Sequence, residues 1–189
     1  MSCIESLIEL DTNLFLWVNQ LSGNPTLDSI MLAFSSKWLW LPLYVFLAYY
    51  SYREYKRGSL LWIVLAAAIM IVITDQGSVN LFKEVFQRLR PCHEDELKGL
   101  VNLVSGSCGG QFGFVSSHAA NVFGLASFLS VALPQFGAKG LLLFGWAAMV
   151  SISRVYLGVH YPFDIIIGAV FGGIVGWSTA IVTMKSIVK

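Results

Sequence analysis

The sequence predicts an all-α integral membrane protein, a helical bundle of five to six transmembrane helices that begins with an amphipathic helix. Hydrophobic residues fill 56% of the 189 positions, whereas charged residues fill only 12%, about half of the share found in ordinary soluble domains. The mean hydropathy is +0.70. This composition excludes a soluble globule, whose surface needs more polar side chains, and it also excludes a disordered chain. The formal net charge of +1 provides no overall field that would attract nucleic acid.

Residues 1–36 are predicted to form amphipathic helices that lie in the membrane interface. Positions 1–23 contain no lysine or arginine, so we do not expect a cleavable signal peptide there. Hydrophobic residues recur at steps of three and four, as on one face of a helix, and a second short apolar stretch follows a Gly-Asn-Pro turn at 23–25. The apolar positions of the first helix are Ile4, Leu7, Ile8, Leu14, Phe15, Val18 and Leu21.

Residues 37–184 are predicted to form the transmembrane bundle of a single domain that covers 1–189. Tryptophans and tyrosines mark the two ends of the first apolar stretch, as expected where aromatic side chains meet the membrane interface. Glycines at 168, 172 and 176 predict a face of small residues on the last helix, suited to close helix packing. The predicted spans lie at about 38–52, 59–80, 118–133, 139–157 and 162–184.

Basic residues predict which side of the membrane is cytoplasmic. They gather in the connection between the first two spans, in the turn before the fourth span and in the C-terminal tail, which all fall on one side. The positive-inside rule makes this side cytoplasmic, so the long loop 88–117 and the N-terminal helix are expected outside. We therefore expect a bacterial inner-membrane protein whose polar face meets the periplasm or exterior. The basic residues are Arg53, Lys56, Arg57, Lys139, Lys185 and Lys189.

Polar and ionisable residues gather in three groups near the outer ends of the predicted spans. Buried charge near a bilayer is costly, so such residues are functional candidates. A transporter or channel, the alternative class, would need polar residues across the full membrane depth, whereas these stand at one end of the helices. The groups are Lys83 with Arg88 and Arg90, then Ser116 to His118, and finally Arg154 with His160 and Asp164.

The first two groups have the chemistry of an anion site. Lys83 and Arg90 are seven residues apart, which is two helical turns, so both are expected along one face of an extended second helix. Either cation alone is equally explained as one that reaches toward lipid headgroups. The glycine-rich stretch 106–113 comes shortly before Ser116, where free N–H groups at a helix start favour a phosphate. Ser116 alone is equally explained as a helix cap.

The third group has the chemistry of an activated histidine. His160 and Asp164 are spaced i, i+4, and Pro162 stands where the first turn of a helix tolerates proline. The carboxylate can then accept the Nδ1–H of the imidazole, which leaves the other ring nitrogen as a nucleophile or base. Arg154 adds a guanidinium from the preceding helix. Taken alone, the His160–Asp164 pair is also explained as a structural hydrogen bond.

Taken together, these residues resemble the three-part signature of the type 2 phosphatidic acid phosphatase (PAP2) superfamily, whose fold is shared with vanadium haloperoxidases. The middle motif of the family usually reads Pro-Ser-Gly-His, whereas Val115 and Ser117 stand at its first and third positions in this sequence. The resemblance implies a haloperoxidase-like helical core. The matching segments are Lys83-x6-Arg90-Pro91, Ser116-Ser117-His118 and Ser153-Arg154-x5-His160-x3-Asp164.

The resemblance also implies a reaction, metal-independent hydrolysis at the outer membrane face. His160 would attack phosphorus to form a phosphohistidine, Asp164 would orient it, and His118 would protonate the leaving oxygen and later activate water. No metal or other cofactor is expected, because the cations of the site supply the charge that Mg²⁺ provides in kinases. The implied phosphate-binding residues are Lys83, Arg90, Arg154, Ser116 and Ser117.

The expected substrate is a lipid phosphate or diphosphate, and undecaprenyl diphosphate is the first expectation by similarity. Phosphatidylglycerophosphate, phosphatidic acid and lipid A phosphates are alternatives, and a non-enzymatic transporter or channel is the alternative from another class. The expected partners are this substrate and membrane lipids, without nucleic acid and with the oligomeric state left open.

Two further features stay open at the level of sequence. Cys92 and Cys108 flank the outer loop and would pair in an oxidising compartment, although two free thiols are equally compatible with the sequence. Asp75 stands with other polar residues near the outer end of the second span. It either tunes Lys83 or satisfies neighbouring helices.

Overall fold

The computed structural model describes residues 3–55 and 57–187, and these residues form helices, connecting segments and one isolated bridge between Leu89 and Phe112. The predicted all-α class is confirmed. Lys56 and Lys189, two of the basic residues used to predict sidedness, lie outside the described residues. The α-helices are α1 (Cys3–Asn19), α2 (Pro25–Ser35), α3 (Leu41–Glu54), α4 (Arg57–Gly77), α5 (Glu84–Phe86), α6 (Ser117–Ala132), α7 (Leu141–Tyr156) and α8 (Pro162–Ile187). A π-helix η1 (Ser78–Lys83) and the 3₁₀ helices η2 (Pro91–His93), η3 (Asp95–Leu97) and η4 (Pro134–Gly140) complete the set.

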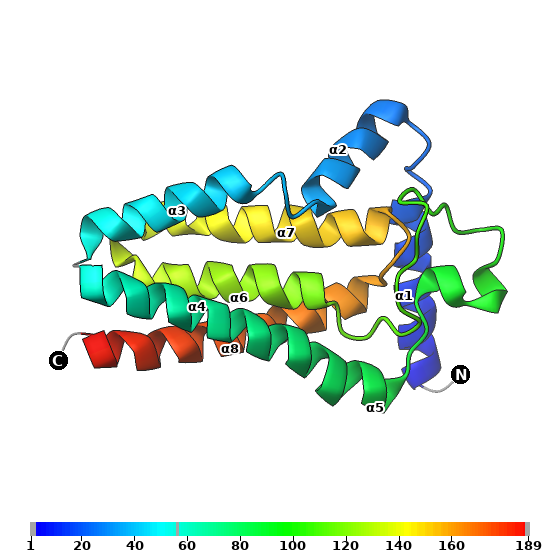
Figure 1. Cartoon of the computed structure of the whole chain (residues 1–189). Coiled ribbons are helices and arrows are strands. Elements are labelled where there is room, and N and C mark those ends of the chain that lie inside the picture. Colours follow the sequence, from blue (N-terminus) through cyan, green and yellow to red (C-terminus); the bar gives the residue numbers. More distant parts are fainter. Residues whose placement is uncertain (1–2, 56, 188–189) are drawn as a thin grey trace.

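The helices α3, α4, α6, α7 and α8 run along one common axis, whereas α1 lies across one end of this bundle (Figure 1). Helix α6 contacts α4, α7 and α8. The connection from α3 to α4, the η4 turn and the C-terminal end of α8 all lie at the end opposite α1 (Figure 1). Arg53, Lys139 and Lys185 belong to these segments, so the described basic residues share one end, as the sequence predicts.

Among the described residues, three helices are long and apolar enough to cross a membrane, Ser59–Phe86, Pro134–Tyr156 and Pro162–Ile187. The sequence predicts five spans. The other two contain helices of only 16 residues in α6 and 14 in α3, about 24 Å and 21 Å long, against about 30 Å of hydrocarbon. Helix α6 begins directly after its Ser116 cap, close to the predicted start at 118.

The second span is longer than the predicted 59–80. Residues Ser78–Lys83 form a π-helix, which inserts an extra residue into the helical turn and is frequent at functional sites, and α5 continues to Phe86. Gln87 has a φ of +47° and ends the helix. The hydropathy signal stops early because Asn80 and Lys83 interrupt it, although the backbone stays helical.

Helices α6 and α8 pack with their backbones in close approach. A Cβ atom added at Gly172 would lie 2.0 Å from the carbonyl oxygen of Ala120, and one at Gly176 would lie 2.1 Å from that of Gly124. No side chain fits at such distances, so glycine is required at both positions. The predicted face of small residues is therefore confirmed.

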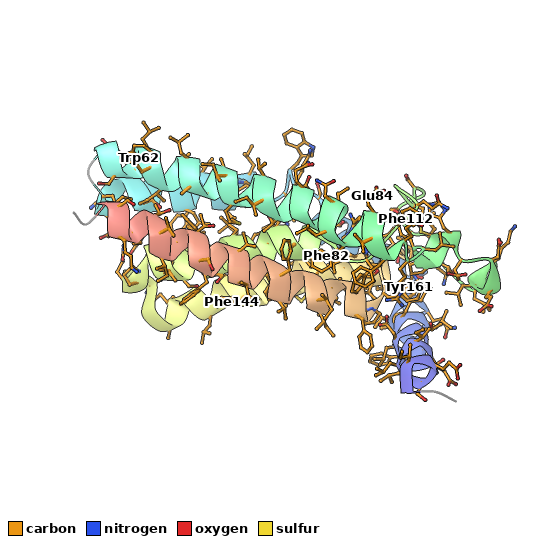
Figure 2. All side chains as sticks on the ribbon, turned by 90° about the horizontal axis from the view of Figure 1, so that it is seen from below. Trp62, Phe82, Glu84, Phe112, Phe144 and Tyr161 are labelled. Carbon is orange, nitrogen blue, oxygen red and sulfur yellow. A yellow bond between two sulfur atoms is a disulfide. The ribbon has the colours of Figure 1, made fainter. Side chains whose placement is uncertain are left out.

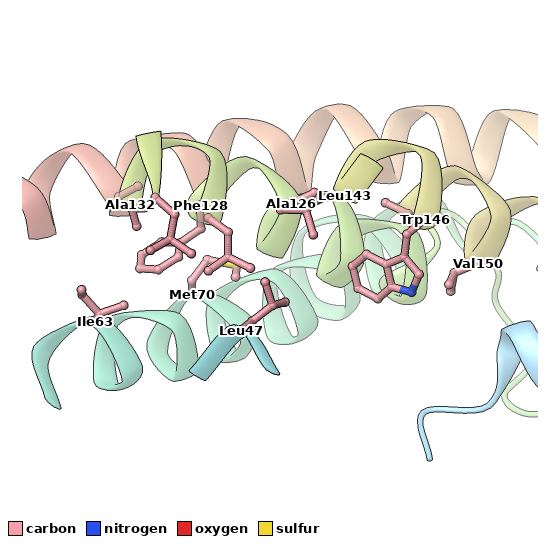
Figure 3. Packing of buried hydrophobic residues seen from close by; sticks show 13 residues of the cluster. Leu47, Ile63, Met70, Ala126, Phe128, Ala132, Leu143, Trp146 and Val150 are labelled. Atoms are coloured by element: carbon pink, nitrogen blue, oxygen red, sulfur yellow. The ribbon is translucent and has the colours of Figure 1, made fainter. Parts of the chain in front are cut away.

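The inner faces of the helices build one apolar core, while the outer faces remain apolar and exposed. Met70 of α4, Phe128 of α6 and Trp146 of α7 pack together in this core (Figure 3). Phe82 lies between the outer end of the α4–α5 helix and α8 (Figure 2), with its ring centroid 5.2 Å from that of Phe171. Exposed apolar side chains are those expected to meet lipid, among them Trp62, Val72, Leu81, Leu141, Ile174 and Trp177.

A row of buried side chains holds α1 against the bundle. Asp11, Phe15 and Asn19 follow one another at every fourth position and are fully buried. Phe15 packs edge-on against Tyr161, whose side chain lies beside α1 (Figure 2), and Asn19 exchanges hydrogen bonds with the backbone of Asn102. Other apolar side chains of α1 are exposed, as expected of a helix in the membrane interface. Its exposed residues include Ile4, Leu7, Ile8, Leu14 and Trp17.

Replacing Gly172 by alanine is expected to destabilise the protein by about 1–3 kcal/mol, because the new methyl group overlaps the Ala120 carbonyl. Gly173→Ala is the matched control, since a Cβ at Gly173 meets no atom within 4 Å and alanine is the better helix former. Thermal unfolding of both variants in detergent micelles is the measurement. Equal melting temperatures for the two variants would contradict the close-packing argument.

Candidate active site

A polar cavity of about 330 Å³ lies where the outer ends of the helices meet the long loop. It collects residues from all three predicted groups, although these are far apart in the sequence. The chain segments that supply them are η1, the loop before α6, the first turn of α6, the last turn of α7 and the connection to α8. The lining residues are Lys83, Arg90, Ser107, Cys108, Gly109, Ser117, His118, Arg154 and His160.

His160 is held between a carboxylate and a guanidinium. Its Nδ1 atom lies 3.2 Å from Oδ2 of Asp164, and its Nε2 atom lies 3.4 Å from Nη1 of Arg90. A guanidinium can only donate hydrogen bonds, so Nε2 is the acceptor and Nδ1 carries the proton that is donated to Asp164. The unprotonated Nε2 of His160 therefore belongs to the wall of the cavity.

The short connection between α7 and α8 fixes this geometry. Gly158 has a φ of +85°, a conformation that side chains rarely allow, and the chain turns there toward α8. Pro162 then begins α8, which places Asp164 in its first turn. The backbone N–H of Tyr161 also donates to Oδ2 of Asp164, at 3.0 Å. The carboxylate that faces His160 is thus fixed by the start of its own helix.

Lys83 and Arg90 both line the cavity. Their seven-residue spacing predicts that they share one helix face, but they do not. The helix ends at Phe86, and the extended Arg90 donates its N–H to the carbonyl of Gln111 at 3.1 Å. Lys83 is presented by the π-helix, and its Nζ donates to Oγ of Ser117 at 2.8 Å. The prediction of one extended helix is wrong, because the chain reverses after Phe86.

Arg154 supplies the third cation of the cavity. It lies in the last turn of α7 and donates to the hydroxyl of Ser35 at the end of α2. The Nε atoms of Arg90 and Arg154 are buried and have no hydrogen-bond partner among the described residues. Since buried donors are normally paired, these N–H groups suit an anionic ligand in the cavity.

The two serines of the middle motif occupy different places. Ser117 lines the cavity and accepts the hydrogen bond from Lys83. Ser116 is fully buried, and its hydroxyl accepts a hydrogen bond from the N–H of Ala119 as the cap of α6. Ser116, predicted to bind phosphate, thus caps α6 and lies outside the lining of the cavity.

One wall of the cavity is formed by Ser107, Cys108 and Gly109. A disulfide joins this wall to the beginning of the same loop. Cys92 and Cys108 form a disulfide whose Cα atoms are 6.0 Å apart, within the usual range for such bonds. Because Cys92 follows Arg90 by two residues, the bridge links this wall to the strand-like segment that carries a cavity cation.

Two residues outside the predicted catalytic and phosphate-binding sets reach the site, Asp11 and Arg88, of which only Arg88 is among the functional candidates from sequence. Arg88 donates through Nη1 to Oδ1 of Asp164 at 3.1 Å and through Nη2 to Oδ2 of Asp11 at 2.7 Å. Asp11 belongs to the buried row of α1 with Phe15 and Asn19. The spacing of Asp11 and Phe15, which puts a charged and an aromatic side chain on one face, is the available signal in the sequence. It does not identify Asp11 as a site residue, because the pattern of an amphipathic helix does not reveal which face is buried against protein.

Comparison with known proteins gives a consistent result. Residues 59–187 match the PAP2 superfamily. The chain is 39% identical to the lipid A 4'-phosphatase of Bacteroides thetaiotaomicron, over 92% of this chain and 77% of that protein. It is 35% identical to the lipid A 4'-phosphatase of Porphyromonas gingivalis, over 92% of this chain and 72% of that protein.

The chain belongs to the PAP2 superfamily. The crystal structure of Aquifex aeolicus LpxE superposes with a TM-score of 0.63 and 26% identity, over 93% of this chain and 95% of that one. A PAP2-type phosphatidylglycerolphosphate phosphatase from Bacillus subtilis shares the fold, with a TM-score of 0.65 and 23% identity over 98% and 88% of the two chains. This PAP2 protein is a membrane lipid phosphatase, so the transporter and channel alternatives no longer apply.

The polar cavity adjoins a second cavity of about 680 Å³ between α3, α4, α6 and α7. His118 lines both cavities. Asp75, whose role the sequence leaves open, lines the second cavity together with Asn121. Most of the remaining lining is apolar or aromatic, and includes Phe34, Trp40, Tyr44, Leu47, Ile63, Leu125 and Phe128.

The electrostatics of the polar cavity favour the neutral form of His160. Burial lowers the pKa of His160 well below its ordinary value of 6.5, and the positive charges of Arg90, Arg154 and Lys83 lower it further. A neutral imidazole is the form that can act as a nucleophile. The cations that suit a phosphate therefore also disfavour protonation of His160.

We expect His160 to remain neutral in the free protein at pH 6.5, where an unperturbed histidine is half protonated. Histidine-selective isotope labelling and NMR titration in micelles measure this, with the His160→Gln variant assigning the signal. Half-protonation of His160 at or above pH 6.5 would contradict the electrostatic argument.

Proposed function

We propose that this PAP2 phosphatase hydrolyses a phosphate monoester of a lipid A-type glycolipid, at the 4' position. The observation that supports a lipid phosphate is the pair of adjoining cavities, one lined by cations and one mostly apolar, which share His118. The glycolipid class is supported by the two lipid A 4'-phosphatases, which match 92% of this chain. These relatives favour lipid A over undecaprenyl diphosphate, the first expectation from sequence.

In the first chemical step Nε2 of His160 attacks phosphorus and the bond from phosphorus to the lipid oxygen breaks. Asp164 accepts the Nδ1–H throughout, which keeps the ring in the reactive tautomer and stabilises the charge that develops on it. His118 gives a proton to the leaving oxygen, so the lipid departs as an alcohol. The product of this step is a phosphohistidine.

In the second step a water molecule attacks phosphorus of the phosphohistidine and the nitrogen–phosphorus bond breaks. His118, left without its proton by the first step, accepts a proton from this water. His160 returns to its neutral form and inorganic phosphate leaves. Both half-reactions thus use the same two histidines, and His118 changes role between acid and base.

Lys83, Arg90 and Arg154 bind the phosphoryl oxygens in this proposal. Charge spreads over these oxygens in the transition state of phosphoryl transfer, and fixed cations stabilise it without reorganisation. The two unpartnered Nε–H groups of the arginines are donors suited to this purpose, and Ser117 adds a hydroxyl beside Lys83. The hydrocarbon of the lipid would occupy the apolar cavity on the other side of His118.

We propose the periplasmic face of a bacterial inner membrane as the location of the reaction. Arg53, Lys139 and Lys185 belong to segments at the bundle end opposite α1 (Figure 1), whereas the polar cavity is lined by residues near the α1 end. Basic residues favour the cytoplasmic side, so this arrangement supports an outward-facing cavity.

The purified protein is expected to release one phosphate from bis-phosphorylated lipid A in mixed micelles, with tandem mass spectrometry locating the loss at the 4' position. Activity should persist in EDTA, since the cations carry the charge, and the His160→Ala variant should be inactive. Undecaprenyl diphosphate and phosphatidylglycerophosphate are measured in parallel. A higher kcat/KM on either of these lipids, or loss at the 1 position, would contradict the proposed substrate.

The acid role of His118 predicts a dependence on the leaving group. His118→Ala should lower kcat strongly, about 10²–10⁴-fold, on the lipid monoester, whose alkoxide needs a proton. The loss should be much smaller on a nitrophenyl phosphate, because nitrophenolate leaves without protonation. Single-turnover phosphate release on both substrates is the measurement, and equal losses would remove the acid role.

A further inference from the structure

A chain of ionic hydrogen bonds runs from the interfacial helix α1 to the nucleophile. Oδ2 of Asp11 accepts from Arg88 at 2.7 Å, and Arg88 donates with its other nitrogen to Oδ1 of Asp164 at 3.1 Å. Oδ2 of Asp164 faces Nδ1 of His160 at 3.2 Å. One guanidinium thus joins two carboxylates, and only the second of these touches the histidine.

The carboxylate of Asp11 is held in position by burial and hydrogen bonds, as is that of Asp164. Asp11 and Asp164 are both fully buried, and a buried charge persists only when it is paired and hydrogen-bonded. The second oxygen of Asp11 accepts the N–H of Phe163 at 2.8 Å. This N–H belongs to the first turn of α8, where helix N–H groups lack partners within the helix and the dipole favours an anion.

Arg88 is fixed by more than its two salt bridges. Its guanidinium lies over the ring of Tyr161, 4.0 Å from the centroid, in the range of a cation–π contact. Tyr161 in turn packs against Phe15 of α1. Arg88 therefore has a single defined position between α1 and α8, and it lies outside the lining of the phosphate cavity.

We propose that Asp11 and Arg88 are positioning residues that set the orientation and effective charge of Asp164, and through it the reactivity of His160. This inference rests on the proposed role of His160 as the nucleophile. Because Asp11 neutralises part of the positive charge of Arg88, Arg88 neutralises Asp164 less fully. Asp164 then keeps enough negative charge to accept the Nδ1–H of His160. The interfacial helix is thereby part of the catalytic machinery rather than only a membrane anchor.

Charge balance gives the two residues opposite effects on the protonation of His160. Without the charge of Asp11, Arg88 would neutralise Asp164 more fully, and His160 would protonate only at lower pH. Without Arg88, Asp164 would carry uncompensated negative charge, and His160 would protonate at higher pH. Among the described residues, the charged and titratable groups that face His160 and Asp164 are Lys83 from η1, Arg88 and Arg90 from the loop, His118 from α6, Arg154 from α7, Tyr161 from the α7–α8 connection and Asp11 from α1.

The test compares Asp11→Asn and Arg88→Gln in the full-length protein, using nitrophenyl phosphate so that lipid specificity plays no part. Both variants should lose about 10–100-fold in kcat, as changes behind a reactive group usually do. The acid limb of kcat/KM should move to lower pH in Asp11→Asn and to higher pH in Arg88→Gln. Arg88→Lys keeps the positive charge but loses the two-sided geometry of the guanidinium. Its kcat should therefore fall, while the acid limb of its kcat/KM profile stays near the wild-type position.

Asp28→Asn is the matched control for damage to the N-terminal region. Asp28 is an aspartate of α2 that also accepts a hydrogen bond across the fold, from Tyr156 at 2.6 Å, but it is not connected to Asp164 in the described hydrogen bonds. The inference is overturned if the acid limb does not move in either variant, or if Asp28→Asn reproduces their kinetics at equal melting temperature. Should Asp11→Asn not fold, the opposing behaviour of Arg88→Gln and Arg88→Lys decides alone.

Failure of the proposed function has a different signature. If lipid A is not the substrate, the pH shifts with nitrophenyl phosphate remain. If His160 is not the nucleophile, the His160→Ala variant retains turnover, whatever the Asp11 and Arg88 variants do.

Discussion

The contact between α6 and α8 is the constraint on which the site depends. A Cβ at Gly168 would lie 2.7 Å from the Ser116 carbonyl, and the N–H of Ser116 donates to the carbonyl of Asp164 at 2.9 Å. The start of α6, which carries His118, is thereby fixed against the start of α8, which follows His160. Two histidines of different segments can act on one phosphorus atom only if this contact holds their helices in register.

Electrostatic compensation is the second requirement of the architecture. Lys83, Arg90 and Arg154 meet in one half-buried cavity, where their mutual repulsion favours an anionic ligand. Asp164 contributes a compensating negative charge on the far side of His160 from the cavity. In our proposal, Asp11 and Arg88 set how strongly this negative charge acts on the imidazole. The site is therefore a layered arrangement, with cations at the cavity wall and carboxylates in the layer beneath.

The sequence predicts which side chains meet in one cavity better than it predicts the helices that carry them. Lys83, Arg90, Ser117, His118, Arg154 and His160 line one cavity, because a motif records which side chains the chemistry needs. The shared helix for Lys83 and Arg90 was wrong, since a π-helix and a left-handed Gln87 change the path of the chain. Neither feature has a periodic signal that a hydropathy pattern detects.

By itself the sequence determined the membrane environment, the all-α class, the close packing glycines and the histidine–aspartate pair, since each of these depends on composition or on spacing within one segment. Only the tertiary structure decided that Ser117 rather than Ser116 faces the cavity and that Asp11 reaches Asp164 through Arg88. These facts depend on how helices distant in the sequence face one another. A hydrogen bond between residues 11 and 88 leaves no pattern in either segment, because its geometry arises only when α1 is laid across the end of the bundle.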